Sequence, residues 1–142
     1  MILSRVLGLD PGERRIGVAL SDPIGMIAQP YVVLDRKAVD AVAAIRDLCT
    51  EYEIEIVVIG LPTSLSGEEG PAAVKARELG AAISEGTDCE VTFFDERFTT
   101  VQAESALIEG GMRRRQRRET VDKVAAAVML QGYLDTRPGN DS

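Results

Sequence analysis

The order of the apolar runs is the feature that most limits how this chain can fold. Three such runs follow one another at its start, over residues 2–10, 14–22 and 28–35, and the short segments between them contain Asp, Pro and Gly. Short apolar runs bounded by such turn residues are typical of β-strands. Three strands with short connections predict an antiparallel meander.

The pattern changes after the third run. Residues 37–53 predict a helix, with Asp35 as a candidate cap, because apolar side chains recur at helical spacing at Val39, Val42, Ala43, Ile45 and Leu48. Residues 54–62 are short and nearly all apolar, which suits a strand buried on both faces. We expect this strand at the centre of a sheet.

The alternation of helix and strand continues along the chain. A second helix is predicted over residues 68–85, where Ser66 and Glu69 have capping-box spacing, and a fifth strand over residues 89–97. The predicted fold is therefore α/β: a five-stranded mixed sheet, made of the antiparallel meander and parallel strands, with helices on both faces.

Two further helices are expected near the carboxyl terminus. The first covers residues 99–111, with Thr99 and Gln102 at capping-box spacing, and residues 113–119 are interpreted as a loop. The last helix begins near Thr120 and ends before Pro138, with one apolar face formed by Val121, Val124, Ala125, Val128 and Met129. We expect one domain over residues 1–136 and a disordered tail over residues 137–142.

Composition excludes several kinds of site. The chain has no histidine, which removes the serine and cysteine triads that depend on it. Its two cysteines, Cys49 and Cys89, are too few for a disulfide framework or a zinc cluster, and we expect both to be buried as small apolar residues. No signal segment or apolar run of about 20 residues is present, so a cytoplasmic location is expected.

Charge is unevenly distributed. Residues 113–119 (RRRQRRE) carry +4, whereas the net charge of −7 leaves −11 on the rest of the chain. A run of like charges is usually a solvated face. Here it is interpreted as a phosphate-binding segment, because Lys and Arg contacts dominate affinity for nucleic acids.

Three acids from distant parts of the chain are candidates for one site. Asp10 ends the first strand, Glu96 ends the fifth, and Asp122 lies in the first turn of the last helix. The carboxyl ends of parallel strands meet at one edge of a sheet, where ligands collect. Three carboxylates without histidine or cysteine would form an oxygen site suited to Mg²⁺ or Mn²⁺, which can drive phosphodiester hydrolysis.

Each acid also has a structural interpretation. Asp10 precedes Pro11 and Gly12 and is a common turn residue, and Asp122 is stabilised by the helix dipole. Asp95 competes with Glu96, because strand periodicity alone does not decide which of the two faces the site.

Several cations and hydroxyls have two interpretations. Arg97 either pairs with Asp95 or holds a phosphate, and Arg14 and Arg15 near Asp10 have the same ambiguity. The hydroxyl residues before the second helix would bind phosphate or cap the helix; they are Thr63, Ser64 and Ser66. The aromatic residues near the fifth strand are expected in the core; they are Phe93, Phe94 and Phe98.

Four ordered blocks resemble the YqgF family, also called RuvX-type Holliday junction resolvases and assigned as pre-16S rRNA nucleases, within the ribonuclease H-like superfamily. The blocks are residues 8–22 (GLDPGERRIGVALSD), 57–70 (VVIGLPTSLSGEEG), 93–100 (FFDERFTT) and 121–135 (VDKVAAAVMLQGYLD). The family's acidic positions fall on Asp10, Glu96 and Asp122. An acid that the family often has in the second block is replaced here by Ser66.

The resemblance implies a metal-dependent nuclease that processes the 5′ end of precursor 16S rRNA. Asp10, Glu96 and Asp122 would be catalytic and would hold Mg²⁺ or Mn²⁺. Nucleic acid would be bound by arginines, namely Arg14, Arg15, Arg97, Arg113, Arg114, Arg115, Arg117 and Arg118. The alternatives are a resolvase of branched DNA, a non-catalytic RNA-binding module and a phosphotransferase. A monomer or weak homodimer with no membrane partner is expected.

Overall fold

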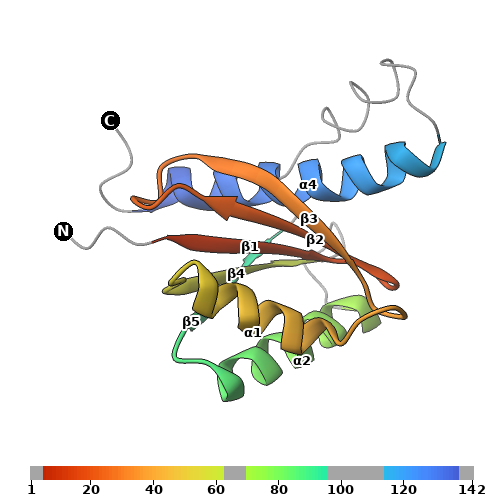
Figure 1. Ribbon diagram of the computed structural model, residues 1–142, viewed down its shortest axis with the longest axis horizontal. Coiled ribbons are helices and arrows are strands. Elements are labelled where there is room, and N and C mark those ends of the chain that lie inside the picture. The colour runs from red at the N-terminus through yellow and green to blue at the C-terminus, as the bar shows by residue number, and fades with distance from the viewer. Residues whose placement is uncertain (1–4, 63–69, 96–113, 138–142) are drawn as a thin grey trace.

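The computed structural model describes residues 5–62, 70–95 and 114–137. The described strands form one five-stranded sheet in the order β3-β2-β1-β4-β5 (Figure 1). Their bounds are β1 Val6–Pro11, β2 Arg15–Ser21, β3 Ala28–Asp35, β4 Ile56–Leu61 and β5 Glu90–Asp95.

The strand directions confirm the predicted mixed sheet. β1 pairs antiparallel with β2, and β2 pairs antiparallel with β3, which is the expected meander. β1 pairs parallel with β4, and β4 pairs parallel with β5, so the carboxyl ends of these three strands share one edge. β4 is an interior strand as expected, but β1 occupies the middle of the sheet.

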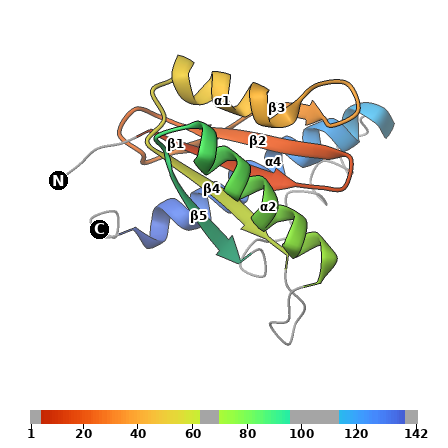
Figure 2. The same cartoon turned by 90° about the horizontal axis from the view of Figure 1, so that it is seen from below.

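Helices cover both faces of the sheet. The helices α1 (Ala41–Glu51) and α2 (Pro71–Gly86) lie on one face, and α4 (Arg114–Thr136) lies on the other, as Figures 1 and 2 show from two directions. We refer to these as the α1/α2 face and the α4 face.

The two faces bury different side chains. The core on the α1/α2 face is built from large aliphatic residues such as Leu9, Ile16 and Ile59. On the α4 face the sheet presents smaller residues, among them Gly8, where a Cβ would approach Leu130 within 2.8 Å. Lack of a side chain at Gly8 therefore allows α4 to lie close to the sheet.

The first two helices begin at other caps than those predicted. Asp40, not Asp35, caps α1, because its carboxylate accepts a hydrogen bond from the N–H of Ala43. Val39 precedes the helix and is exposed, as is Ala43. The N-cap of α2 is Gly70, with Pro71 at the first helical position, where proline is favoured because its missing N–H is not needed.

The loop predicted over residues 113–119 is wrong over residues 114–119, and Arg113 lies outside the described residues. α4 begins at Arg114 and continues without a break through Thr120. Arginine is a good helix former, and a charge run lacks the Gly or Pro that would end a helix. The predicted helix over residues 99–111 lies outside the described residues.

The predicted apolar face of α4 is also wrong for most of its members. Ala126, Ala127, Met129, Leu130 and Leu134 are the buried apolar residues, whereas Val124, Ala125 and Val128 are only half-buried. The angle at which α4 crosses the sheet decides which of its apolar residues are buried, and apolar periodicity alone does not reveal that angle. Val121 has no described side chain.

The remaining structural predictions are tested in part. Cys49 is buried and Cys89 half-buried, and both are free thiols. Burial and the neighbouring Cys89 raise the pKa of Cys49 to about 12.

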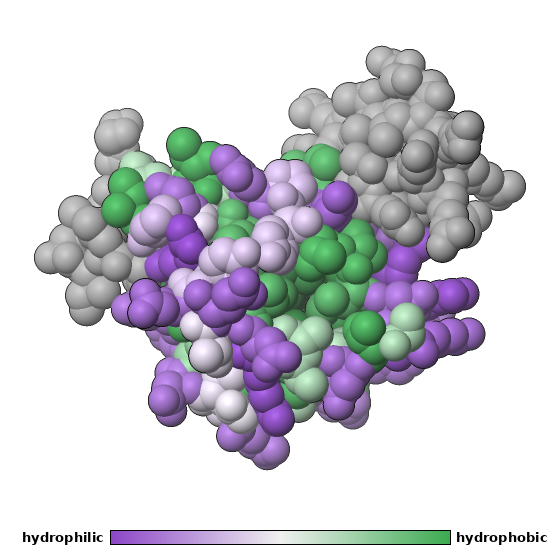
Figure 3. Space-filling model, in the orientation of Figure 1, coloured by the Kyte–Doolittle hydropathy of each residue, from purple (hydrophilic) through white to green (hydrophobic). Residues whose placement is uncertain are grey.

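Within the described ranges, every helix is too short or too polar to span a bilayer. Hydrophilic residues cover much of the face drawn in Figure 3, and hydrophobic residues gather near its middle. The predicted disorder of residues 138–142 lies outside the described residues.

Candidate active site at the carboxyl edge of the sheet

Asp10 lies on the α4 face of β1. Side chains alternate along a strand, and Leu7 and Leu9 belong to the core on the α1/α2 face. Val6 belongs to the opposite core, and Gly8 faces Leu130 of α4. Asp10 therefore points toward α4 at the carboxyl edge, where it is half-buried.

Gly17 brings Asp122 to the same place. Gly17 is the cross-strand partner of Asp10 in the β1–β2 ladder. A Cβ at Gly17 would overlap the backbone carbonyl oxygen of Asp122, so α4 crosses the sheet directly over this glycine. Two of the three predicted acids are thus neighbours, although 112 positions separate them in the sequence.

Arg15 neutralises part of this acidic charge. Its Nε lies 2.9 Å from Oδ2 of Asp122, and the two side chains are 30% and 31% exposed. Arg15 stands two residues before Gly17 on β2, so strand alternation directs it toward α4 as well. Sequence reasoning proposed Arg15 as a nucleic-acid ligand, whereas the structure pairs it with a predicted metal ligand.

The register of β5 resolves the competition between Asp95 and Glu96 in part. Phe93 packs against the core on the α1/α2 face and Phe94 against the core on the α4 face. Asp95 is paired with Leu61, which also belongs to the α1/α2 face, so Asp95 is directed away from Asp10 and Asp122. Glu96 lies outside the described residues.

Arg14 is engaged on the other side of the hairpin. Its guanidinium lies 3.3 Å from Oδ2 of Asp35, in an exposed ion pair. The N–H of Lys37 and the Arg14 side chain lower the pKa of Asp35. Exposed pairs of this kind contribute ~0.2–1 kcal/mol, so Arg14 is held only weakly.

The other predicted nucleic-acid ligands are less well defined. Arg97 and Arg113 lie outside the described residues. Four arginines belong to the first turns of α4, although their side chains are outside the described part; these are Arg114, Arg115, Arg117 and Arg118. Their backbone positions lie one to two turns before Asp122 on the same helix. The predicted place of Asp122 in the first turn of the last helix is wrong, because α4 begins at Arg114. The hydroxyl residues Thr63, Ser64 and Ser66, and Phe98, lie outside the described residues.

The donor set fits a hard divalent cation, but it is incomplete among the described residues. Asp10 and Asp122 supply carboxylate oxygens, which Mg²⁺ and Mn²⁺ prefer. No group of three potential ligands from His, Cys, Asp and Glu is found within residues 5–62, 70–95 and 114–137. The paired arginine shows that this place already favours a positive charge beside Asp122.

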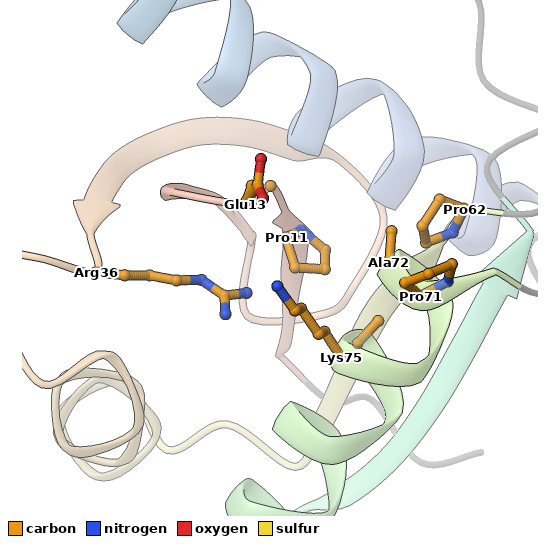
Figure 4. A pocket seen from close by; sticks show the side chains of 9 residues that line it. Pro11, Glu13, Arg36, Pro62, Pro71, Ala72 and Lys75 are labelled. Atoms are coloured by element: carbon orange, nitrogen blue, oxygen red, sulfur yellow. The ribbon is translucent and has the colours of Figure 1, made fainter.

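A pocket at the same edge was not foreseen from the sequence. It has a volume of about 350 Å³ and lies between the β1–β2 turn, the end of β4 and the start of α2 (Figure 4). Two cations line it, Arg36 and Lys75. These residues are far apart in the sequence and belong to no motif, so no sequence signal connects them.

Comparison with known proteins gives a family match over nearly the whole chain. Residues 4–136 match the family described as "RuvX: Holliday junction resolvase". A protein of Syntrophomonas wolfei named "Putative pre-16S rRNA nuclease" is 42% identical over 132 residues, which cover 92% of this chain and 94% of that protein. A protein of the same name from Clostridium beijerinckii is 45% identical over 132 residues, covering 92% and 96% of the two chains.

Solved structures support the fold. RuvC of Thermus thermophilus in complex with a Holliday junction substrate aligns with a TM-score of 0.57 at 16% sequence identity, covering 94% of this chain and 97% of that one. A second structure of Thermus thermophilus RuvC aligns with a TM-score of 0.56. The predicted ribonuclease H-like fold is thus confirmed.

Proposed function

The chain belongs to the RuvX family, and from this membership we propose that it is a metal-dependent nuclease that processes the 5′ end of precursor 16S rRNA. Its curated relatives carry the name of a pre-16S rRNA nuclease and match over most of their length. The observation that carries the chemistry is the meeting of Asp10 and Asp122 over Gly17, at the edge of the sheet where ligands collect.

Asp10, Asp122 and Glu96 are the proposed ligands of Mg²⁺ or Mn²⁺. Such an ion, when bound, lowers the pKa of a water molecule and stabilises the departing oxygen of a phosphodiester. Glu96 is included because Asp95, its alternative, is directed to the opposite face of the sheet with Leu61.

The protein's own residues would organise the substrate. Arg15 holds Asp122 in place through its ion pair and reduces repulsion between neighbouring carboxylates. The arginines at the start of α4 precede Asp122 by one to two helical turns, and their charge would bind backbone phosphates. A basic helix beside an acidic site would thus compensate for a chain whose net charge is −7.

Branched DNA is the second candidate substrate. The family description names Holliday junction resolvases, and RuvC in complex with a junction shares the fold. Symmetric cleavage of a four-way junction needs two active sites, whereas we propose a monomer or weak homodimer. We also propose a cytoplasmic location, where precursor rRNA is found.

Cleavage assays with matched variants test the proposal. The substrates are a 5′-extended 16S rRNA fragment, an unrelated single-stranded RNA of equal length and a four-way DNA junction, each with Mg²⁺, Mn²⁺ or chelator. Asp10→Asn and Asp122→Asn are each expected to slow metal-dependent cleavage by about a thousandfold, equivalent to ~4 kcal/mol of lost transition-state stabilisation. Asp47→Asn, on the exposed side of α1, is the control and should retain full activity.

The outcomes separate the candidate functions. Cleavage of the rRNA fragment alone supports the proposal, and cleavage of the junction alone supports the resolvase. Unchanged RNA binding in chelator with no turnover in either metal would instead identify a binding module. Full activity of Asp10→Asn would exclude the proposed site.

A further inference from the structure

The pocket at the carboxyl edge lies on the side of the sheet away from the acids. It is lined by Pro11 at the end of β1, Pro62 after β4, and Pro71 and Lys75 of α2, together with Arg36 after β3. Asp10 and Pro11 are consecutive, but alternation directs Asp10 to the α4 face and Pro11 into the pocket. The pocket and the acids are therefore neighbours across the edge of one strand.

Two cations converge on this pocket. Figure 4 shows the guanidinium of Arg36, just after β3, and the ammonium group of Lys75, in α2, both directed toward Pro11. Glu13 of the β1–β2 turn also lines the pocket, so the charged side chains sum to +1. In a protein of net charge −7, a positive concave site is a local exception.

Arg36 has an unused hydrogen-bond donor. Among the residues that the structure describes, its buried Nε has no hydrogen-bond partner. A buried charged donor without a partner costs more than a neutral one, and an anionic acceptor in the pocket would remove that cost.

The first turn of α2 adds one further donor to the pocket, the backbone N–H of Ala72. Gly70 is the N-cap, Pro71 has no N–H, and the N–H groups of Ala73 and Val74 donate to the carbonyl oxygen of Gly70. The first N–H groups of a helix carry partial positive charge and favour anions. Two cations and the first turn of α2 thus surround one cavity of about 350 Å³, and one of the two cations, Arg36, carries the buried Nε without a partner among the described residues.

We propose that this pocket binds a phosphate group of the nucleic-acid strand, next to the bond that is cleaved. The inference rests on the proposed function and extends it from the α4 face to the α1/α2 face. A strand that crosses the carboxyl edge of β1 passes from Asp10 to Pro11, so a phosphate near the scissile one reaches Arg36 and Lys75. The pocket fixes the position of the strand and does not take part in bond cleavage.

RNA binding by the full chain tests the pocket separately from catalysis. A fluorescein-labelled single-stranded RNA is titrated in chelator at several salt concentrations, with fluorescence anisotropy as readout. The double variant Arg36→Gln/Lys75→Gln is expected to bind about tenfold more weakly. Loss of one phosphate contact should also reduce the slope of log K against log salt by about 0.7.

Two further variants are matched controls. Lys37→Gln removes the same charge from an exposed residue next to Arg36 that does not line the pocket, and it should bind RNA like the wild type. Lys75→Arg keeps the positive charge and should retain most of the affinity. Thermal unfolding of each variant checks that the fold is intact.

Free phosphate has the same chemistry as a backbone phosphate, so a second arm separates them. Calorimetric titration with inorganic phosphate measures whether the pocket binds the free ion. Tight binding of inorganic phosphate that the double variant loses, with unchanged RNA affinity, would overturn the assignment to nucleic acid. Equal RNA affinity and equal salt slope in the wild type and double variant would overturn it as well.

The two proposals fail in different ways. If the double variant loses RNA affinity but the wild type cleaves nothing in either metal, the pocket assignment holds and the nuclease assignment fails. If the wild type cleaves and the double variant binds and cleaves equally well, the nuclease assignment holds and the pocket assignment is wrong.

Discussion

The two faces of the sheet differ most at its carboxyl edge. On the α4 face, Asp10 and Asp122 bring negative charge together beside Arg15. On the α1/α2 face, Arg36 and Lys75 bring positive charge to a pocket. Alternation along β1 directs Asp10 to the α4 face and Pro11 to the pocket, so the acids and the two cations lie on opposite sides of the sheet. One edge can thus hold a cation on the α4 face and an anion on the α1/α2 face.

The packing of the two faces differs in the same way. Large aliphatic side chains fill the α1/α2 face, whereas glycines at positions 8 and 17 let the backbone of α4 approach β1 and β2. The acidic site therefore depends on close contact between a helix and the sheet. The basic pocket depends instead on two long side chains, Arg36 and Lys75, that line a cavity.

The largest expected effect comes from a substitution that disturbs the close contact between α4 and the sheet. Gly17→Ala introduces a Cβ that overlaps the carbonyl oxygen of Asp122. We expect a loss of ~2–3 kcal/mol in the free energy of unfolding and about a hundredfold loss of cleavage, because α4 must move away from Asp10. Denaturant unfolding and the cleavage assay measure the two effects.

Gly70→Ala is the matched control for this substitution. A Cβ at Gly70 would meet nothing within 4 Å. Its effect on the free energy of unfolding should stay at or below about 1 kcal/mol, because glycine is preferred over alanine at an N-cap by roughly that amount. Equal destabilisation by the two variants would contradict the contrast between the faces.

Removal of Arg15 should have a smaller effect that depends on divalent cations. Without metal, Arg15→Gln leaves the acids without their counter-charge, and we expect a loss of ~1 kcal/mol, or ~3 °C in Tm. Excess Mg²⁺ should reduce this difference, since the ion supplies the missing positive charge. Calorimetric unfolding with and without Mg²⁺ measures both values.

Arg14→Gln supplies the comparison, because Arg14 pairs with Asp35 away from the acids. Its effect should not change with Mg²⁺. If Arg15→Gln gains no more stability from Mg²⁺ than Arg14→Gln does, the proposed ion does not bind beside Asp122.

The smallest expected effect lies far from both sites, in the β2–β3 turn. Desolvation opposes ionisation of Asp22, but the N–H groups of Ile27 and Met26, which donate to its carboxylate, lower its pKa overall. A pKa below that of the unfolded chain (~3.9) means that the carboxylate stabilises the fold above that pH. This stabilisation is lost as the pH falls through the folded pKa.

Asp22→Ala should therefore lower Tm by about 2 °C at pH 7 and by less at pH 3. Asp47→Ala, on the exposed side of α1, is the control variant. Thermal unfolding followed by circular dichroism at the two pH values measures the difference. A Tm difference between the wild type and Asp22→Ala that is larger at pH 3 than at pH 7 would contradict a lowered pKa of Asp22.

Much of the fold was predictable from local patterns. The meander, the buried β4 and the strand that ends near Asp95 follow from apolar runs and turn residues. The charged start of α4 was misassigned because a run of arginines looks like a solvated loop, although arginine favours helix. The helix caps were also predicted wrongly, because several Asp and Ser residues near the start of each helix are equally suitable as caps.

The sequence by itself determined which residue types are available for chemistry. Without histidine, and with three well-separated acids, it limited the chemistry to carboxylates, cations and a hard metal ion. These conclusions follow from the identity and order of the residues, which the sequence gives without any knowledge of the fold.

Only the tertiary structure decided which groups meet. The contact of Asp122 with Gly17, the pairing of Arg15, and the convergence of Arg36 and Lys75 join residues from different elements. Such contacts depend on strand register and on how closely a helix packs, because a shift of one residue turns a side chain to the other face. No local pattern in the sequence predicts the strand register or the distance between α4 and the sheet.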